Sequence, residues 1–206
     1  LAAVDSNIAQ SLRPSFAFVE SLLVQKSEAE RQLWFAHYLQ GEVFGNAGWE
    51  IGGANGQVSA RLVPEGEHFR ANGSKYYSTG ALYADWVSAV ALDENEEPVS
   101  FVVPRDREGL ELVDDFDAMG PRLTASGTTR LNNVLVRREE IRTRVVEEGQ
   151  RSIITPFLQL FLGAVQAGIA RNALNDAVAF AKDHARPIKH SSASRSVDDP
   201  YVAFSV

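Results

Sequence analysis

The sequence predicts an α+β multidomain protein with a helical N-terminal part, a central β-barrel or sandwich, and an incomplete C-terminal helical bundle. Apolar residues recur at helical spacing in the first forty residues and again after Gly149, but alternate with a period of two in between. Acidic or Gly/Pro-rich turns divide the middle region into five or six short strands. We therefore expect three parts: the end of an N-terminal helical domain (1–40), a central β domain (41–148) and the start of a truncated helical bundle (149–206).

The composition fits a folded protein of a reducing compartment. The 206 residues, 45% of them hydrophobic, can bury a substantial core. The absence of cysteine excludes disulfides, thiolate nucleophiles and cysteine-ligated zinc. No apolar run approaches the ~20 residues needed to span a bilayer, and the N-terminus lacks a secretory-signal pattern. The expectation is a soluble, cytoplasmic protein without a membrane partner.

The charge pattern argues against a nucleic-acid partner. The net charge is -7, and no segment gathers Lys and Arg on one face. The arginines between positions 137 and 144 are interleaved with glutamates, which favours a solvated surface of mixed charge. The sequence has no phosphate-binding loop and no metal-ligand spacing, so no metal site is expected.

Two helices are expected before residue 40. The first should begin after Asp5 or Ser6 and be interrupted by Pro14, because proline removes a backbone donor. The second should begin at Ser27, which forms the Ser-x-x-Glu capping box with Glu30.

The central region should hold short strands. Alternation around Ala60 and Leu62 predicts the first of them. Asn72-Gly73 predicts a tight hairpin between 69–71 and 75–77, since both residues tolerate positive φ. Further strands are expected at 86–92, 99–103, 109–113 and 128–136.

A long helix is expected from Pro156 to about His184, followed by a polar stretch and a new helix start at Asp198-Asp199-Pro200. The long helix is apolar on all sides and carries small residues spaced by four. A single helix of that kind cannot bury itself, and small residues let another helix approach closely. We therefore expect a bundle that a further segment or another chain completes.

Three local motifs carry a resemblance to a known family. Gly73 to Gly80 reads Gly-Ser-Lys-Tyr-Tyr-Ser-Thr-Gly, Met119 to Arg122 is followed by Thr124 to Thr129, and Ala185-Arg186-Pro187 closes the long helix. With the order helices, β domain, long helix, they resemble the acyl-CoA dehydrogenase superfamily across nearly all of the chain. The first motif is similar to the strand beside the flavin ring in that family.

Two segments resemble the flavin-dependent monooxygenase branch, typified by dibenzothiophene monooxygenase and sulfone monooxygenase-like proteins. Phe44-Gly45-Asn46-Ala47 replaces a Thr-Glu-Pro-rich loop of the dehydrogenases, and Ser126 to Thr129 matches the monooxygenase form of the second motif. One departure concerns the substrate: Gln10 and Pro14 stand where dibenzothiophene monooxygenase has a histidine and a tyrosine, so its substrate cannot be transferred to this chain.

The resemblance implies an enzyme that uses reduced FMN and O2 to oxygenate a small sulfur- or nitrogen-containing compound. A separate flavin reductase would supply the reduced flavin, and the enzyme would be a homo-oligomer, expected to be a tetramer. An FAD-dependent acyl-CoA dehydrogenase is the alternative, and a non-catalytic protein with a flavin-binding fold is the third reading.

By the same resemblance, Thr79 would face the N5 edge of the flavin, Tyr77 would lie against its ring, and Ser78 belongs to the same cofactor-binding segment. Asn46 would bind the flavin or steady reactive oxygen, so Asn46 and Thr79 are the catalytic candidates. Arg186 would reach a flavin phosphate of a neighbouring subunit.

Each candidate also has a structural reading. Thr79 could end a strand, Tyr77 could fill a core, and Asn46 could close a turn. Arg186 could interact favourably with the helix dipole at the C-terminus of the long helix.

The remaining polar candidates are weaker. His37, His68, His184 and His190 are expected to be structural, and the catalytic acid or base is expected in a C-terminal segment beyond Val206. Arg122 lines the pocket or pairs with Asp115 or Asp117, and the pairing is favoured.

Overall fold

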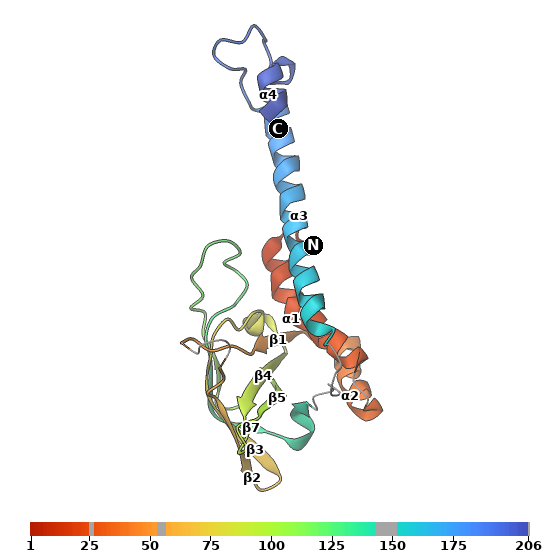
Figure 1. The fold of residues 1–206 in the computed structure, drawn as a ribbon, viewed down its shortest axis with the longest axis vertical. Coiled ribbons are helices and arrows are strands. Elements are labelled where there is room, and N and C mark those ends of the chain that lie inside the picture. The colour runs from red at the N-terminus through yellow and green to blue at the C-terminus, as the bar shows by residue number, and fades with distance from the viewer. Residues whose placement is uncertain (25–26, 53–56, 143–151, 206) are drawn as a thin grey trace.

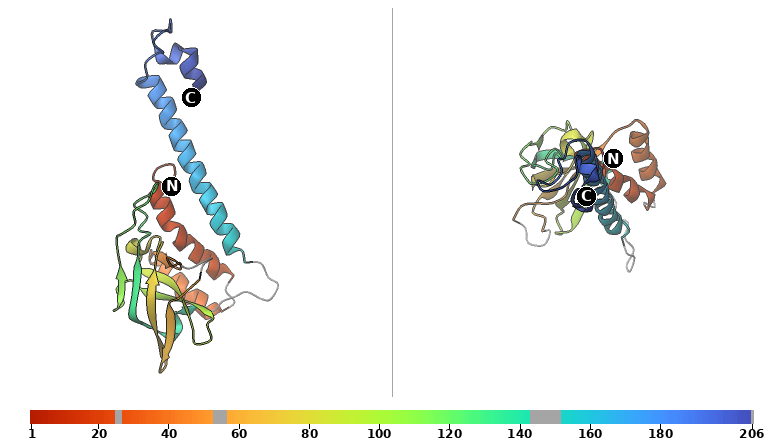
Figure 2. Two further views of the ribbon diagram at one scale, coloured as in Figure 1. Left: turned by 60° about the vertical axis from the view of Figure 1, so that its left-hand side comes forward. Right: turned by 90° about the horizontal axis from the view of Figure 1, so that it is seen from above.

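The computed structural model describes residues 1–24, 27–52, 57–142 and 152–205. A β sheet with two helices against it forms one end of the molecule, and a long helix projects away from it (Figure 1). The same helix starts beside the sheet and leans along the first helix in the side view (Figure 2). The expected boundary at 148/149 lies outside the described residues, and the three-part division stays a prediction.

The N-terminal helices begin where their caps predict. Helix α1 (Ser6–Leu23) starts after Asp5, whose carboxylate accepts hydrogen bonds from the N–H groups of Asn7 at 2.7 Å and Ile8 at 3.2 Å. Helix α2 (Glu28–Leu39) starts after Ser27, whose hydroxyl accepts from the Glu30 N–H at 3.3 Å. Both predicted starts are confirmed.

The expected interruption at Pro14 is wrong, because α1 continues through it. Proline removes one helical hydrogen bond. Tertiary contacts directly after it hold the helix: Ser15 accepts a hydrogen bond from the Phe44 N–H at 3.2 Å, and the Phe18 ring stacks on Phe44 with centroids 4.2 Å apart. We infer that this packing offsets the lost bond.

The strands form one eight-stranded mixed sheet. Its order is β6-β7-β3-β2-β4-β5-β8, with β1 paired in parallel to β4. The bounds are β1 Phe44–Ala47, β2 Arg61–Glu65, β3 His68–Lys75, β4 Trp86–Leu92, β5 Pro98–Pro104, β6 Leu110–Leu112, β7 Thr129–Val136 and β8 Ile141–Arg142. The four later strands predicted from alternation are confirmed. Strands β2 and β4 are joined by the single pair Arg61↔Leu92, and residues from both sides of that junction share one core cluster. The closure into a barrel or sandwich stays a prediction.

The predicted hairpin at Asn72-Gly73 is wrong. The chain turns earlier, at Gly66 (φ 62°), and β2 pairs with β3 in antiparallel register from Glu65↔His68 to Arg61↔Asn72. Gly73 lies inside β3, where the register with β7 shifts. A Cβ on Gly73 would lie 2.5 Å from the Cβ of Ala60, so glycine is needed there for close approach of two backbones and not for a turn.

Two clusters form the core. The first packs residues of the sheet, including the fully buried Val87, Phe101 and Val134. The second is aromatic and joins both N-terminal helices to β1; its buried members are Phe18, Leu22, Trp34, Phe44 and Val102. Because this aromatic cluster fixes α1 against β1, it positions the side chains that the two elements present to each other.

Helix α3 (Ile154–Asp183) is long and mostly uncovered. Among its described residues only Val165 is buried, while Leu160 and Phe180 are 75% and 60% exposed. Its contact with α1 includes Phe16 and Phe161, whose ring centroids are 5.7 Å apart. The larger bundle that the sequence predicts around this apolar helix stays a prediction.

Short helical turns complete the fold. They are η2 (Ala81–Tyr83), η3 (Arg138–Glu140), η4 (Ser196–Asp198) and the C-terminal helix α4 (Pro200–Ser205). The predicted helix start at Pro200 is confirmed. No helix in the described part of the chain is both long and apolar enough to cross a membrane.

The expected solvated mixed-charge surface near residue 140 is partly wrong. Glu140 is 4% exposed and pairs with Arg107. Arg142, with a side chain 10% exposed, pairs with Glu30 at 2.6 Å and lies over the Phe18 ring at 4.5 Å. Arg142 is buried against the N-terminal helices, whereas Glu140 is buried in η3 against Arg107. Arg144, Glu147 and Glu148 lie outside the described residues.

Candidate active site

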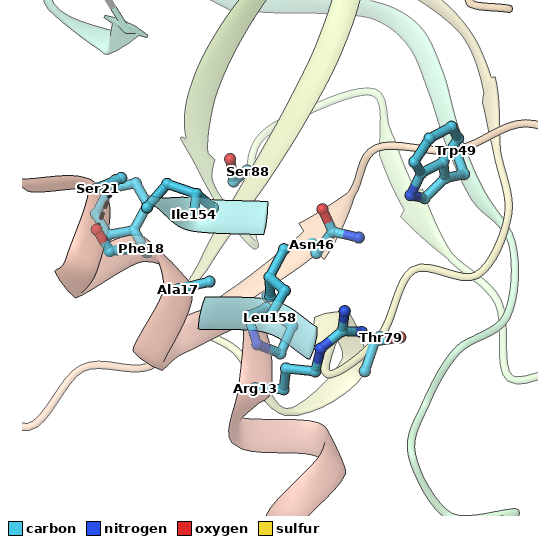
Figure 3. A pocket seen from close by; sticks show the side chains of 12 residues that line it. Arg13, Ala17, Phe18, Ser21, Asn46, Trp49, Thr79, Ser88, Ile154 and Leu158 are labelled. Atoms are coloured by element: carbon cyan, nitrogen blue, oxygen red, sulfur yellow. Dashed lines mark hydrogen bonds between the residues drawn. The ribbon is translucent and has the colours of Figure 1, made fainter. Parts of the chain in front are cut away.

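A cavity of about 260 Å³ lies where α1, β1 and the first turn of α3 meet. Figure 3 shows its lining side chains, which come from segments more than a hundred residues apart. They are Arg13, Pro14, Ala17, Phe18, Ser21, Gly45, Asn46, Trp49, Thr79, Ser88, Ile154 and Leu158. Two of the residues predicted for the site from the sequence, Asn46 and Thr79, therefore share one cavity.

Asn46 is held by backbone bonds while its side chain stays free. Its N–H donates to the Thr79 carbonyl at 3.1 Å, and the parallel pairing of β1 with β4 sets it opposite Ser88. The amide of Asn46 has no hydrogen-bond partner among the described residues, and it projects into the cavity (Figure 3). It does not close a turn, since it lies within β1. A donor and an acceptor are thus available to a ligand.

Thr79 follows β3 in a tightly bent segment. Tyr77 has φ 57° and Gly80 has φ 74°, and a Cβ on Gly80 would lie 2.4 Å from the Ser11 carbonyl oxygen. Glycine at position 80 is thus required by its positive φ and by the close approach of α1. The hydroxyl of Thr79 shares a 3.0 Å hydrogen bond with that of Ser126.

Tyr77 and Ser78 are placed differently from Thr79. Tyr77 is 54% exposed, with its ring packed edge-on against Tyr76 at 4.7 Å. Tyr77 therefore does not fill a core in this chain. Ser78 is buried; its hydroxyl accepts from the Thr129 hydroxyl at 2.8 Å, and its N–H donates to the Gly127 carbonyl at 3.2 Å. Neither residue is part of the cavity lining.

Arg186 lies far from this cavity in the same chain. Ile154 at the start of α3 lines the cavity, whereas Arg186 is an exposed residue just past the far end of this 30-residue helix. An α-helix of that length spans ~45 Å. The structure therefore does not bring Arg186 and Thr79 together within one chain.

Arg13 is a cavity residue that the sequence reading missed. It is the only charged side chain among the described residues that line the cavity. Its Nε is buried without a hydrogen-bond partner in the described chain, and burial lowers the pKa of its guanidinium. A possible signal was an arginine directly before Pro14, on a helix stretch otherwise rich in apolar and small residues.

A buried ion pair supports the cavity wall beside Trp49. Lys75, at the end of β3, donates to the Glu50 carboxylate at 2.5 Å, and their side chains are 0% and 7% exposed. Glu50 also accepts from the N–H groups of Ser59 at 2.8 Å and Ala60 at 3.1 Å. Next to the pair, the Tyr76 N–H donates to the Trp49 carbonyl at 2.8 Å. We call Lys75 and Glu50 the buried clamp.

The clamp also determines the protonation of its members. Desolvation by burial alone would raise the pKa of Glu50, but hydrogen bonds from Lys75, Ser59 and Ala60 outweigh it and lower that pKa to about 2. For Lys75, desolvation lowers the pKa and the bond to Glu50 opposes the shift. Glu50 is therefore charged at neutral pH.

The remaining candidates lie outside the cavity. None of the four histidines lines it. His37, for example, bonds Glu42 at 2.7 Å and packs against Trp86. Arg122 pairs with Asp117 in an exposed position, which agrees with the favoured structural reading. The described residues also contain no cluster of three or more potential metal ligands.

Comparisons with known proteins define the class of this chain. No protein-family model matches it. It is 33% identical over 157 residues to the dibenzothiophene monooxygenase of Mycolicibacterium goodii, covering 70% of this chain and 38% of that protein. It is 28% identical to the probable FMNH2-dependent monooxygenase SfnC of Pseudomonas putida, over 98% of this chain and 51% of that protein. A probable acyl-CoA dehydrogenase of Bacillus subtilis, YngJ, is 26% identical over 144 residues, covering 67% of this chain and 37% of that protein.

A solved structure extends the likeness to the fold. FMN-bound TdsC from Paenibacillus sp. A11-2 superposes with a TM-score of 0.86 and 25% identity, over 98% of this chain and 54% of that one. The chain is similar in sequence and fold to the acyl-CoA dehydrogenase superfamily. Within it, the chain is similar to the flavin-dependent monooxygenase branch. It spans about a third to a half of the length of the relatives it matches.

Proposed function

We propose that this chain is part of a flavin-dependent monooxygenase that uses reduced FMN and O2 to oxygenate a small sulfur- or nitrogen-containing organic compound. One observation carries the proposal. Asn46 and Thr79, which the resemblance assigns to the flavin, line one cavity of a chain that superposes on FMN-bound TdsC with a TM-score of 0.86.

The described cavity fits one edge of a flavin rather than the whole cofactor. Pockets that enclose a complete ligand of this size measure about 300–1,000 Å³, and this one measures about 260 Å³. The free amide of Asn46 and the hydroxyl of Thr79 are a donor and acceptor set suited to the polar edge of the ring, where charge accumulates on reduction. The rest of the cofactor would lie outside this cavity.

When bound, reduced FMN supplies the two electrons needed to cleave the O–O bond of O2, so that one oxygen atom enters the substrate and the other leaves as water. The chain's own residues bind and orient the flavin. Thr79 meets the polar ring edge, and the bond from the Asn46 N–H to the Thr79 carbonyl keeps the two side chains in fixed relation. Phe18 and Leu158 supply an apolar wall that excludes water on their side of the cavity.

The other predicted contacts receive distinct roles in this proposal. The exposed ring of Tyr77 packs against the flavin. Ser78 holds the bend before Thr79, since its own hydrogen bonds are used within the protein. Arg186 binds the flavin phosphate of a neighbouring subunit, because ~45 Å of helix separates it from its own cavity. The working unit is therefore a homo-oligomer, a tetramer by the resemblance, with a separate flavin reductase as partner.

The test uses the full-length oligomeric protein with a purified flavin reductase. FMN affinity is measured by fluorescence titration, and oxygenated products are identified by mass spectrometry with isotopically labelled O2 and a panel of sulfides, sulfinates and amines. Asn46→Ala should weaken FMN binding about tenfold, as expected for loss of a buried ligand hydrogen bond. The matched control Asn132→Ala changes an exposed asparagine on β7. Flavin oxidation that yields only hydrogen peroxide across the panel would refute the proposal.

The similarity to YngJ favours a second candidate, an FAD-dependent acyl-CoA dehydrogenase. That enzyme would lose its flavin absorbance when an acyl-CoA is added without oxygen. The monooxygenase should show no such bleaching. A full-length oligomer that binds neither flavin at micromolar concentration would instead support a non-catalytic role.

A further inference from the structure

Arg13 is a partly buried cation without a countercharge in the described chain. Two other arginines, with side chains 10% exposed, are paired: Arg107 with Glu140 and Arg142 with Glu30. Arg13 has no ion pair among the described residues, and its Nε is buried without a hydrogen-bond partner. Partial desolvation of a charge that has no partner is costly, so proteins keep such a charge mainly where a ligand or a partner compensates it.

The position of the guanidinium points to a ligand in the cavity. Figure 3 shows Arg13 reaching from α1 toward Thr79, with Asn46 across the space between α1 and β1. No aspartate or glutamate is among the described residues that line the cavity, so the guanidinium is the one formal charge that this part of the chain places there. Its planar N–H groups match the two oxygens of a carboxylate or a sulfinate, or two of the oxygens of a sulfonate.

The rest of the lining defines the other half of such a ligand. Phe18, Ile154 and Leu158 are apolar, and Trp49 adds an indole face. In the part of the cavity that the flavin edge leaves open, one cation and apolar walls suit a small amphiphilic anion, an aryl or alkyl group that carries an oxyanion.

We propose that Arg13 is a specificity-determining residue that binds the oxyanion group of a small organic substrate, a carboxylate, sulfinate or sulfonate, beside Asn46 and Thr79. This rests on the function proposed above for the same cavity. The flavin phosphate is also an oxyanion that a guanidinium binds, but it fits the position of Arg13 less well than a substrate does. Thr79 and Asn46 are assigned to the ring edge, and the phosphate lies at the opposite end of the cofactor, beyond its ribityl chain.

The test compares two probes that share a reacting sulfur and differ in charge: para-(methylthio)benzoate, an anion, and para-(methylthio)benzamide, which is neutral. Binding to the flavin-free full-length protein is measured by calorimetry and by the fluorescence of Trp49, with Trp49→Phe identifying its signal. Turnover of both probes to their sulfoxides is measured with reduced FMN. The variants are Arg13→Gln and Arg13→Lys, and Arg61→Gln is the control because Arg61 lies in an exposed pair on β2.

The wild-type protein should bind the benzoate at least about tenfold more tightly than the benzamide, as one charge-assisted contact provides. Arg13→Gln should remove that preference and leave benzamide binding within about a factor of two. Arg13→Lys should restore part of it, since lysine keeps the charge without the planar fork. Arg61→Gln should behave as wild type.

Three outcomes would overturn the proposal separately from the monooxygenase function. Equal binding of the two probes by the wild type would show that no oxyanion is recognised. An unchanged preference in Arg13→Gln would assign recognition to another residue. A loss of affinity in Arg13→Gln for FMN but not for riboflavin, which lacks the phosphate, would move the contact to the cofactor. Failure of the monooxygenase function would appear instead as absent flavin binding or absent sulfoxide, with the anion preference in flavin-free protein intact.

Discussion

Replacing Lys75 by methionine should destabilise the protein by about 3 kcal/mol. The side chains of Lys75 and Glu50 are 0% and 7% exposed, so little solvent screening reduces the interaction. Breaking a buried pair by removing one partner costs about 3–5 kcal/mol, because the other charge is left uncompensated. The lower end applies here because Glu50 retains hydrogen bonds from Ser59 and Ala60. Methionine preserves much of the volume of the lysine stem.

The loss should appear in both chemical and thermal denaturation. For a chain of about 200 residues, 3 kcal/mol corresponds to a fall in Tm of roughly 6–12 °C. Urea unfolding followed by circular dichroism gives the free energy, and the double variant Lys75→Met with Glu50→Gln closes a cycle that isolates the coupling between the two side chains. Arg61→Gln, which breaks the exposed pair with Glu96, should cost under about 1 kcal/mol.

The reasoning fails if Lys75→Met loses less than about 1 kcal/mol, or if the cycle shows no coupling. Either result would mean that Glu50 is held by its backbone donors alone. The clamp would then not secure the Trp49 segment of the cavity wall.

Three further predictions concern the same framework. The folded-state pKa of Glu50 is lowered to about 2 from 4.5, so its contribution to stability is complete above pH 4.5 and is lost as the pH falls toward 2. The free energy of unfolding should therefore fall less steeply with decreasing pH in Glu50→Gln than in the wild type. Gly80→Ala should cost about 2 kcal/mol or more in urea unfolding, since φ is 74° and the new Cβ would lie 2.4 Å from the Ser11 carbonyl oxygen; Gly41→Ala, with φ 84° and open space, should cost about 1 kcal/mol. Phe44→Ala should cost about 3–5 kcal/mol in the same assay and loosen α1 from β1, while Phe16→Ala, at a 45% exposed position, should cost far less.

Much of the local structure could be predicted because it depends on near neighbours in the sequence. The starts of α1 and α2 follow from the side chains of Asp5 and Ser27, which bond backbone groups two or three residues away. The strands from 86 onward follow from alternation. Gly73 was misread because its role depends on Ala60, a contact made across two strands and invisible in a window of a few residues.

The candidate site could be predicted only in part. Asn46 and Thr79 were found through family motifs, and the structure supplies the reason they act together, a backbone hydrogen bond between β1 and the segment after β3. Arg13 could not be found that way. Whether an arginine on a helix faces solvent or a cavity depends on the tertiary structure, and here the same cavity is lined by residues of α3, some 140 residues later.

Arg13, Asn46 and Thr79 are positioned by one junction, and the part of the apolar wall formed by Ile154 and Leu158 is positioned by another. Arg13 is carried by α1, which the aromatic cluster and the bond from the Phe44 N–H to Ser15 fix against β1. The Asn46 N–H in turn bonds the Thr79 carbonyl. Ile154 and Leu158 belong to α3, which meets this framework along one side. Substitutions in the first turn of α3 should therefore change the size of substrate that fits, while those on α1 and β1 change the charge and polarity that are recognised.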